Sequence, residues 1–136
     1  MPAPRHLIEQ YRKARYRVLG PRAFELRVGE PSPACDALLA QERCASAALL
    51  TAWNPRSEPR PETENAASQA TLVAELAGRR WFEAEGSGDG WPPEPSLLVA
   101  GLGRSEAAVL AARFRQHAFL YCETGRPVEL VLTERA

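Results

Sequence analysis

The order of strand-like and helix-like segments restricts the fold of this chain more than any other feature of its sequence. Alternating patterns predict two hairpins, one near each end of the chain, at residues 16–28 and 118–132. Between them, strand-length apolar segments alternate with helical periodicity. The expected helices cover residues 4–14, 34–43, 63–77 and 105–116, and the expected inner strands cover residues 45–52, 81–85 and 96–101. This order predicts an α+β fold, with a mainly antiparallel mixed sheet packed with three to four helices.

Length and hydropathy indicate one domain. The chain has 136 residues and is 45% apolar, so we expect a single domain over residues 1–136 with a core over about 12–132. No apolar run approaches the roughly 20 residues that span a bilayer, so no membrane association is expected. Residues 1–13 are charged and lack the apolar centre of a signal peptide. The sequence therefore predicts a cytoplasmic protein.

Charge and the counts of Cys and His argue against several classes of function. The 17 basic and 17 acidic residues cancel, which is atypical of a protein that mainly neutralises nucleic-acid phosphates. Three cysteines without a CxxC pair predict neither a disulfide framework nor a zinc site. Two histidines, His6 and His117, give little material for a metal site or a Ser-His-Asp triad. We expect no metal, no cofactor and no nucleic-acid partner.

Two glycine-containing segments superficially resemble phosphate-binding loops. Gly101-Leu102-Gly103 lies between a strand and a helix, but Glu106 occupies the place of the third glycine of a dinucleotide fingerprint. A tight strand-to-helix turn is the better interpretation, and residues 96–123 can then supply one parallel crossover. The segment over residues 86–90 lacks the Gly-Lys-Ser/Thr of a P-loop. With the prolines that follow, it predicts irregular structure over residues 86–95.

Two asparagines have both a structural and a functional interpretation. Asn54, with Trp53 before it and Pro55 after it, ends a buried strand; it forms either an Asx turn or part of a pocket rim. Asn65 lies on the inward face of the predicted third helix, four residues before Gln69. It is either the N-cap of that helix or a polar group that points into a cleft.

Three more residues are candidates on weaker grounds. Glu94 lies between prolines, which fix the direction of its carboxylate; its alternative is a solvated loop charge. Gln116 ends a helix next to a strand and either caps carbonyl groups or faces a cleft. Trp91 either shields a cleft or anchors its own loop.

The combination of these pieces resembles a bacterial family of unknown function, uncharacterised-domain family 3293. The resemblance covers about residues 12–132 and rests on Thr51-Ala52-Trp53-Asn54-Pro55 with Ser57, on Asn65 opening a helix with Leu72 and Leu76, and on Gly86, Trp91, Pro95-Ser96, Gly101, Phe114 and Gln116-His117-Ala118. It implies a compact bacterial domain and brings no substrate or catalytic residue. The signature residues that it implies are Trp53, Asn54, Ser57, Asn65, Glu94 and Gln116.

Three functions are compatible with these residues. The first is binding of a small polar ligand, such as a nucleotide or another metabolite, by Trp53, Asn54, Ser57, Asn65, Trp91 and Gln116 with Glu94, because amides both donate and accept hydrogen bonds. The second is an enzyme that uses Glu94 as general acid or base. The third is an interaction module, in which the C-terminal hairpin pairs edge to edge in a homodimer.

Overall fold

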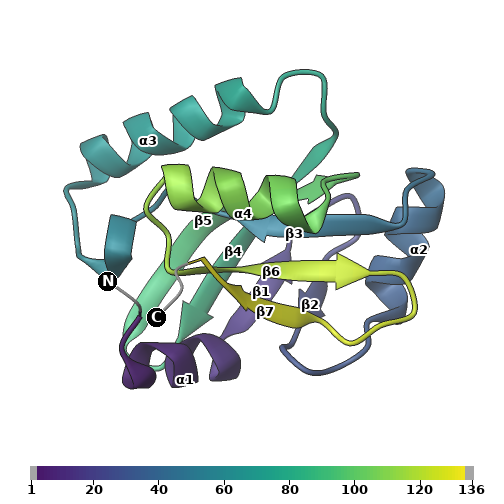
Figure 1. The fold of residues 1–136 in the computed structure, drawn as a ribbon, viewed down its shortest axis with the longest axis horizontal. Helices are drawn as coiled ribbons and strands as arrows, with labels where there is room; N and C mark the ends of the chain where they lie inside the picture. Colours follow the sequence, from purple (N-terminus) through teal and green to yellow (C-terminus); the bar gives the residue numbers. More distant parts are fainter. Residues whose placement is uncertain (1–2, 134–136) are drawn as a thin grey trace.

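The computed structural model describes residues 3–133, so the first two and last three residues of the expected domain lie outside the described part. Four α-helices and one short 3-10 helix accompany seven strands (Figure 1). The helices are α1 (Arg5–Lys13), α2 (Pro33–Gln41), η1 (Pro55–Ser57), α3 (Glu62–Glu75) and α4 (Arg104–Arg113). The strands are β1 (Arg15–Val18), β2 (Phe24–Leu26), β3 (Ser46–Leu50), β4 (Trp81–Gly88), β5 (Trp91–Ala100), β6 (Ala118–Glu123) and β7 (Glu129–Leu132).

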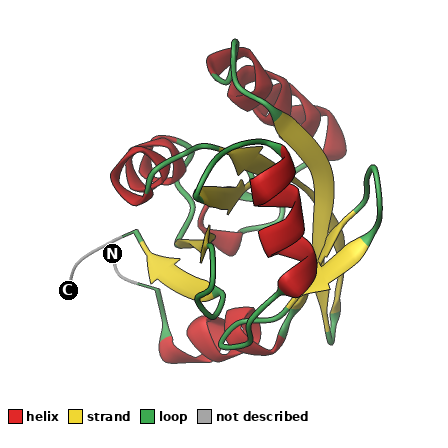
Figure 2. Cartoon of the chain, turned by 90° about the vertical axis from the view of Figure 1, so that its right-hand side faces the viewer, coloured by secondary structure: helices red, strands yellow, loops and turns green. Residues whose placement is uncertain are grey.

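The seven strands form one sheet in the order β2-β1-β4-β5-β3-β6-β7. The sheet is curled (Figure 2). Every pairing is antiparallel, and both terminal hairpins form as expected. The α+β fold is therefore confirmed. The parallel crossover expected over residues 96–123 forms with one strand inserted: β5 and β6 both pair antiparallel with β3, which lies between them, so they run parallel to each other and α4 connects them.

The prediction of irregular structure over residues 86–95 is wrong. β4 continues to Gly88, the chain turns at Asp89 and Gly90, and β5 begins at Trp91. The prolines of β5 are tolerated because β3 pairs with this strand only from Leu97 onward. Their missing N–H groups therefore leave no gap in a second ladder, as for proline on an edge strand.

The two faces of the sheet bury separate apolar clusters, because side chains alternate along each strand. On one face, Leu38 and Leu39 of α2 pack over Leu98 and Leu120. On the other, α3 and α4 supply side chains that pack over neighbouring strand residues. These are Leu72, Leu76, Ala107 and Ala111 from the helices, and Ala48, Leu50, Leu97 and Val99 from the strands. The two faces differ in how completely helices cover them, and this difference positions the site below.

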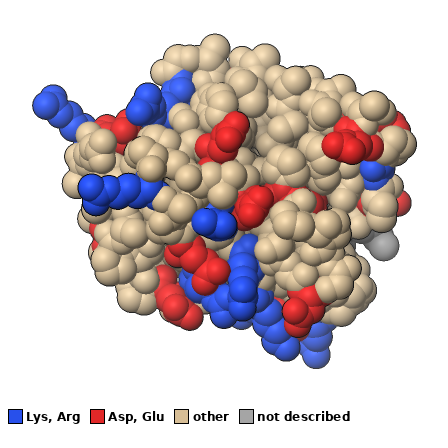
Figure 3. All heavy atoms as spheres, turned by 180° about the vertical axis from the view of Figure 1, so that it is seen from behind, with Lys and Arg blue, Asp and Glu red and all other residues tan. Residues whose placement is uncertain are grey.

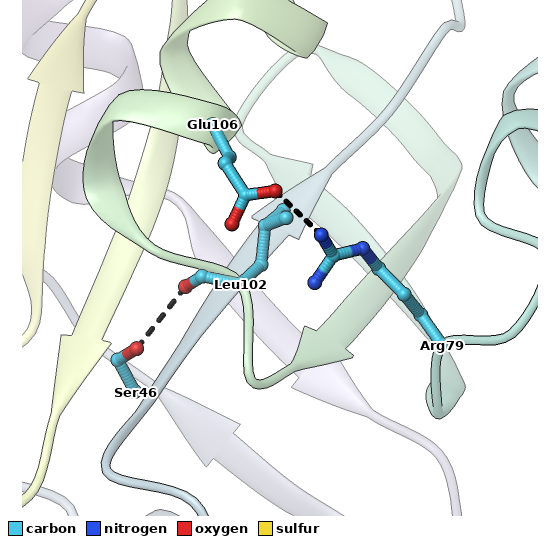
Figure 4. Close-up of polar contacts among 4 residues, drawn as sticks. All are labelled: Ser46, Arg79, Leu102 and Glu106. Carbon is cyan, nitrogen blue, oxygen red and sulfur yellow. Dashed lines mark hydrogen bonds and ion pairs between the residues drawn. The ribbon is translucent and has the colours of Figure 1, made fainter.

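The turn between β5 and α4 is structural. Gly101 has a φ of 79°, which favours glycine, and Leu102 is fully buried. Ser46 Oγ donates a hydrogen bond of 3.1 Å to the Leu102 carbonyl oxygen, and Glu106 pairs with Arg79 at 2.5 Å (Figure 4). The acid that occupies the place of the third glycine thus anchors the turn to the residues after α3.

On the face shown in Figure 3, acidic and basic side chains are interspersed, in keeping with their equal numbers in the sequence. Across residues 3–133, no helix has the length and apolar character needed to span a bilayer. The same residues hold no group of three or more His, Cys, Asp or Glu side chains arranged to bind a metal ion.

β7 lies at one edge of the sheet and, within the described residues, pairs only with β6. An edge strand has unpaired backbone groups that another chain can bind. Pairing of this hairpin in a homodimer stays a prediction, which a measurement of molar mass in solution decides.

Candidate functional site

A hollow opens on the α2 face of the sheet, beyond the end of the apolar cluster. Its volume is about 70 Å³, smaller than the pockets of about 300–1,000 Å³ that enclose drug-sized ligands. It suits a small molecule or one end of a longer one. It is lined by Tyr11, Tyr16, Leu49, Thr51, Trp53, Asn54, Ser57, Gly86, Trp91, Glu94, Ser96, Gln116, Ala118, Phe119, Leu120 and Leu130.

The hollow brings together six of the seven residues singled out from the sequence. Trp53, Asn54 and Ser57 come from the loop after β3, Trp91 and Glu94 from β5, and Gln116 from the junction of α4 and β6. The seventh, Asn65, does not line it.

The floor is a row of residues across three strands. Tyr16 of β1 is opposite Gly86 of β4, and Gly86 is opposite Glu94 of β5. A Cβ atom on Gly86 would lie 3.3 Å from the Tyr16 ring, which is a tight contact. Glycine at this position therefore lets the Tyr16 ring pack closely on β4, opposite the strand that carries Glu94.

Trp91 forms one wall and packs on a second glycine of β4. A Cβ atom on Gly88 would lie 2.4 Å from the Trp91 indole nitrogen, so only glycine allows this contact. The pairing register shifts between Gly86 and Gly88, as in a β-bulge. The glycines that suggested a flexible loop thus seat two aromatic rings.

The loop that carries Trp53 and Asn54 has a strained backbone. Asn54, Arg56 and Ser57 have φ angles of 44°, 57° and 60°. Non-glycine residues adopt such positive φ angles at a cost of about 1–3 kcal/mol each, and they do so where the surroundings hold them. Such strain gathers at functional sites, so the contacts that hold this loop bear on its role.

Asn65 holds this loop in place through hydrogen bonds. It is 2% exposed, and its Oδ1 accepts a 2.8 Å hydrogen bond from the backbone N–H of Asn54. Its Nδ2 donates to Asn54 Oδ1 at 2.7 Å and to the Arg60 carbonyl oxygen at 3.3 Å. α3 begins at Glu62, so Asn65 is neither the N-cap nor a group in the cleft. It fixes the position of Asn54.

Gln116 and His117 hold the other side of the loop. Gln116 Nε2 donates to the Trp53 carbonyl oxygen at 3.1 Å and to that of Phe114 at 3.3 Å. The ring of His117 contacts the Arg56 carbonyl oxygen at 3.2 Å. Gln116 therefore combines the two roles considered for it, since it caps carbonyl groups and also lines the hollow.

The Glu94 side chain is half-buried and unpaired. Within residues 3–133, no hydrogen bond or ion pair involves its carboxylate, whose removal from water raises the pKa of Glu94 from 4.5 to about 7. No Arg, Lys or His of the described chain lines the hollow, so nothing positive compensates this group. Acidic side chains at a protein surface are usually solvated, so a half-buried carboxylate without a partner is unusual.

Two tyrosines complete the site, and neither was predicted. Burial raises the pKa of Tyr11 and of Tyr16, and the nearby Glu94 raises both further. The Tyr11 hydroxyl shares a short hydrogen bond with Ser57 Oγ, and the Tyr16 hydroxyl donates to the Tyr11 carbonyl oxygen at 2.7 Å. Tyr16 was recognisable only as the buried side of a strand, and nothing in the sequence near Tyr11 distinguished it.

A family model described as "Protein of unknown function (DUF3293)" matches residues 50–119. This chain belongs to that family. The DUF3293 match runs from the end of β3 into β6, so it includes Trp53, Asn54, Asn65, Glu94 and Gln116. Tyr11 and Tyr16 lie outside the matched segment. No curated protein and no solved structure matches the chain.

Proposed function

We propose that this DUF3293 protein binds a small polar ligand in the hollow formed by the loop after β3, the start of β5 and the junction of α4 and β6. One observation carries the proposal: six polar or aromatic residues chosen from the sequence alone, spread over residues 53–116, line one hollow. Chance placement of surface residues would scatter them over several faces.

The remaining hydrogen-bonding capacity supports this function. Asn54 Oδ1 accepts from Asn65 and from the Arg60 N–H at 3.1 Å, which leaves its Nδ2 without a partner among residues 3–133. Gln116 donates from Nε2 to two carbonyl groups, which leaves its Oε1 available to accept a hydrogen bond from a ligand. The site therefore offers one amide donor, one amide acceptor and the Glu94 carboxyl group beside aromatic rings.

A thermal-shift screen against a metabolite library tests the proposal. A ligand at one hundred times its Kd adds about 2.7 kcal/mol of stability and raises Tm by roughly 10 °C for a chain of this size. Trp53→Leu should abolish the shift from each hit. Trp81→Leu is the matched control, because Trp81 packs against the apolar cluster on the opposite face. Hits that both variants affect equally, or a screen without hits, would contradict the proposal.

A second function is favoured by the pKa of Glu94. A general acid or base works best when its pKa is close to the working pH, and burial raises that of Glu94 to about 7. An enzyme would convert a hit to product, and Glu94→Gln would stop conversion while Kd changes little. Hits that wild-type protein binds and leaves intact would favour simple binding instead.

A further inference from the structure

We infer that the ligand of the hollow is a cationic amine, held by Glu94 and by the aromatic walls. The inference rests on the proposed function and adds the chemical class of the ligand. It also argues against the nucleotide suggested by the sequence, whose phosphates would find no positive group in the described lining.

The first argument is charge. Glu94 is the one acidic side chain in the lining, and no basic side chain of the described chain accompanies it. A half-buried carboxylate without a partner is unfavourable, and an ammonium group at hydrogen-bond distance would remove that cost. A phosphate or a carboxylate would increase it.

The second argument is the aromatic lining. Four aromatic residues line the same hollow from four different elements. Tyr11 belongs to α1, Tyr16 to β1, Trp53 to the loop after β3, and Trp91 to β5. The faces of such rings attract cations by about 0.5–2 kcal/mol each, and aromatic rings combined with an acid are a known way to recognise ammonium groups. Neutral polar ligands gain less from four rings.

The third argument is the set of unused hydrogen-bonding atoms. Glu94 and Gln116 Oε1 are both acceptors, which suits the N–H donors of an ammonium group. The Asn54 Nδ2 donor can bind an oxygen atom elsewhere on the same ligand. The volume of about 70 Å³ suits an alkylammonium group rather than a large ring system.

Three probes of similar size separate the classes: propylammonium, 1-propanol and propionate. Two-dimensional NMR of the indole N–H groups reports binding, because Trp53 and Trp91 line the hollow while Trp81 lies on the opposite face. We expect propylammonium to shift the first two signals, to leave that of Trp81 in place, and to bind at least tenfold more tightly than the other probes.

Variants test whether Glu94 is responsible. Glu94→Gln should weaken propylammonium binding at least tenfold and leave 1-propanol binding within about twofold. Glu83→Gln, an exposed acid of β4, should change neither. Trp53→Leu, which keeps the carboxylate, should weaken the amine severalfold. Circular dichroism confirms that each variant is folded.

The pH dependence gives a reading that a structural role would not produce. An alkylammonium stays protonated between pH 6 and 8, so only the site titrates. The titratable side chains that face Glu94 are Tyr11 on α1 and Tyr16 on β1, and both stay neutral in this range. Ionisation of Glu94 should therefore tighten amine binding about tenfold from pH 6 to pH 8.

The outcomes of these experiments distinguish the amine inference from the proposed function on which it rests. Tighter binding of propionate or 1-propanol, or an amine affinity that Glu94→Gln leaves unchanged, overturns the amine inference while binding in the hollow stands. If none of the three probes shifts the indole signals of Trp53 and Trp91, the amine inference is also overturned. The library screen then decides the proposed function separately.

Discussion

The two faces of the same sheet have different degrees of closure. On one face, α3 and α4 cover the strands, and the buried side chains there are almost all apolar. On the other, α2 covers only one end, and the sheet beyond it is lined by Tyr16, Glu94 and Ser96. In β5, Leu97 to Ala100 form a continuous buried apolar run, whereas the first half of the strand, at the uncovered end, is only partly buried and holds Glu94.

This difference separates stability from function. The covered face gains its free energy from apolar burial, which scales with the apolar area removed from water and is non-directional. The hollow holds strained backbone and an unpaired, half-buried acid, both of which cost free energy, and directional hydrogen bonds that hold its loop in place. Four substitutions test this contrast.

The largest loss of stability should come from the covered face. Leu102 is fully buried there, so Leu102→Ala should lower the free energy of unfolding by about 2–5 kcal/mol, measured by urea denaturation. The indole signals of Trp53 and Trp91 should keep their positions, since the hollow lies across the sheet. Changed signals at both would mean that the two faces are coupled.

The next effect concerns the support of the loop. Asn65→Ala removes three hydrogen bonds and leaves the Asn54 N–H without its acceptor, so stability should fall by about 1–3 kcal/mol. Unlike Leu102→Ala, it should also shift the Trp53 indole signal. Ser68→Ala on the same helix is the control and should change stability by less than about 0.5 kcal/mol. An unmoved Trp53 signal in Asn65→Ala would refute this role.

Glu94 should make stability depend on pH. The pKa of Glu94 is about 7 in the folded state and 4.5 as an ordinary side chain, so between these values the folded state binds the extra proton. Its contribution to stability is present below about pH 4.5 and is lost as the pH rises through 7. Relative to Glu94→Gln, wild-type protein should lose about 1–2 kcal/mol between pH 5 and pH 8, after allowance for partial solvent exposure. Urea denaturation at each pH measures the difference, and parallel curves would show that Glu94 titrates normally.

The smallest effect should come from the wall of the hollow. Gly88→Ala puts a methyl group against the Trp91 ring, which has to move, at a cost of about 1 kcal/mol. The Trp91 indole signal should shift while that of Trp53 stays. Gly103→Ala is the control for the Trp91 signal, because the nearest atom to its Cβ would be 3.9 Å away; its own stability change reflects the N-cap of α4 instead. A Trp91 signal that is the same in Gly88→Ala and wild type would disprove the contact.

Sequence patterns were reliable where local chemistry decides structure. α2 begins after Ser32, whose side chain accepts from the Cys35 N–H at 3.1 Å, and Pro33 starts its first turn. The final hairpin forms around the expected turn. The patterns failed over residues 86–95. Gly86 and Gly88 there make room for the rings of Tyr16 and Trp91, and the prolines are tolerated because β3 does not pair with that part of β5. Sequence periodicity reports neither condition.

Periodicity and capping act over a few neighbouring residues, so the fold class, most of the elements and the unexplained polar residues could be predicted from the sequence. Three features could not: the contact of Asn65 with Asn54, the place of Tyr11 and Tyr16 in the hollow, and the desolvation of Glu94 without a cation beside it. These are properties of strand register and of side chains as far apart in sequence as Tyr11 and Gln116, and desolvation depends on what surrounds a group in three dimensions.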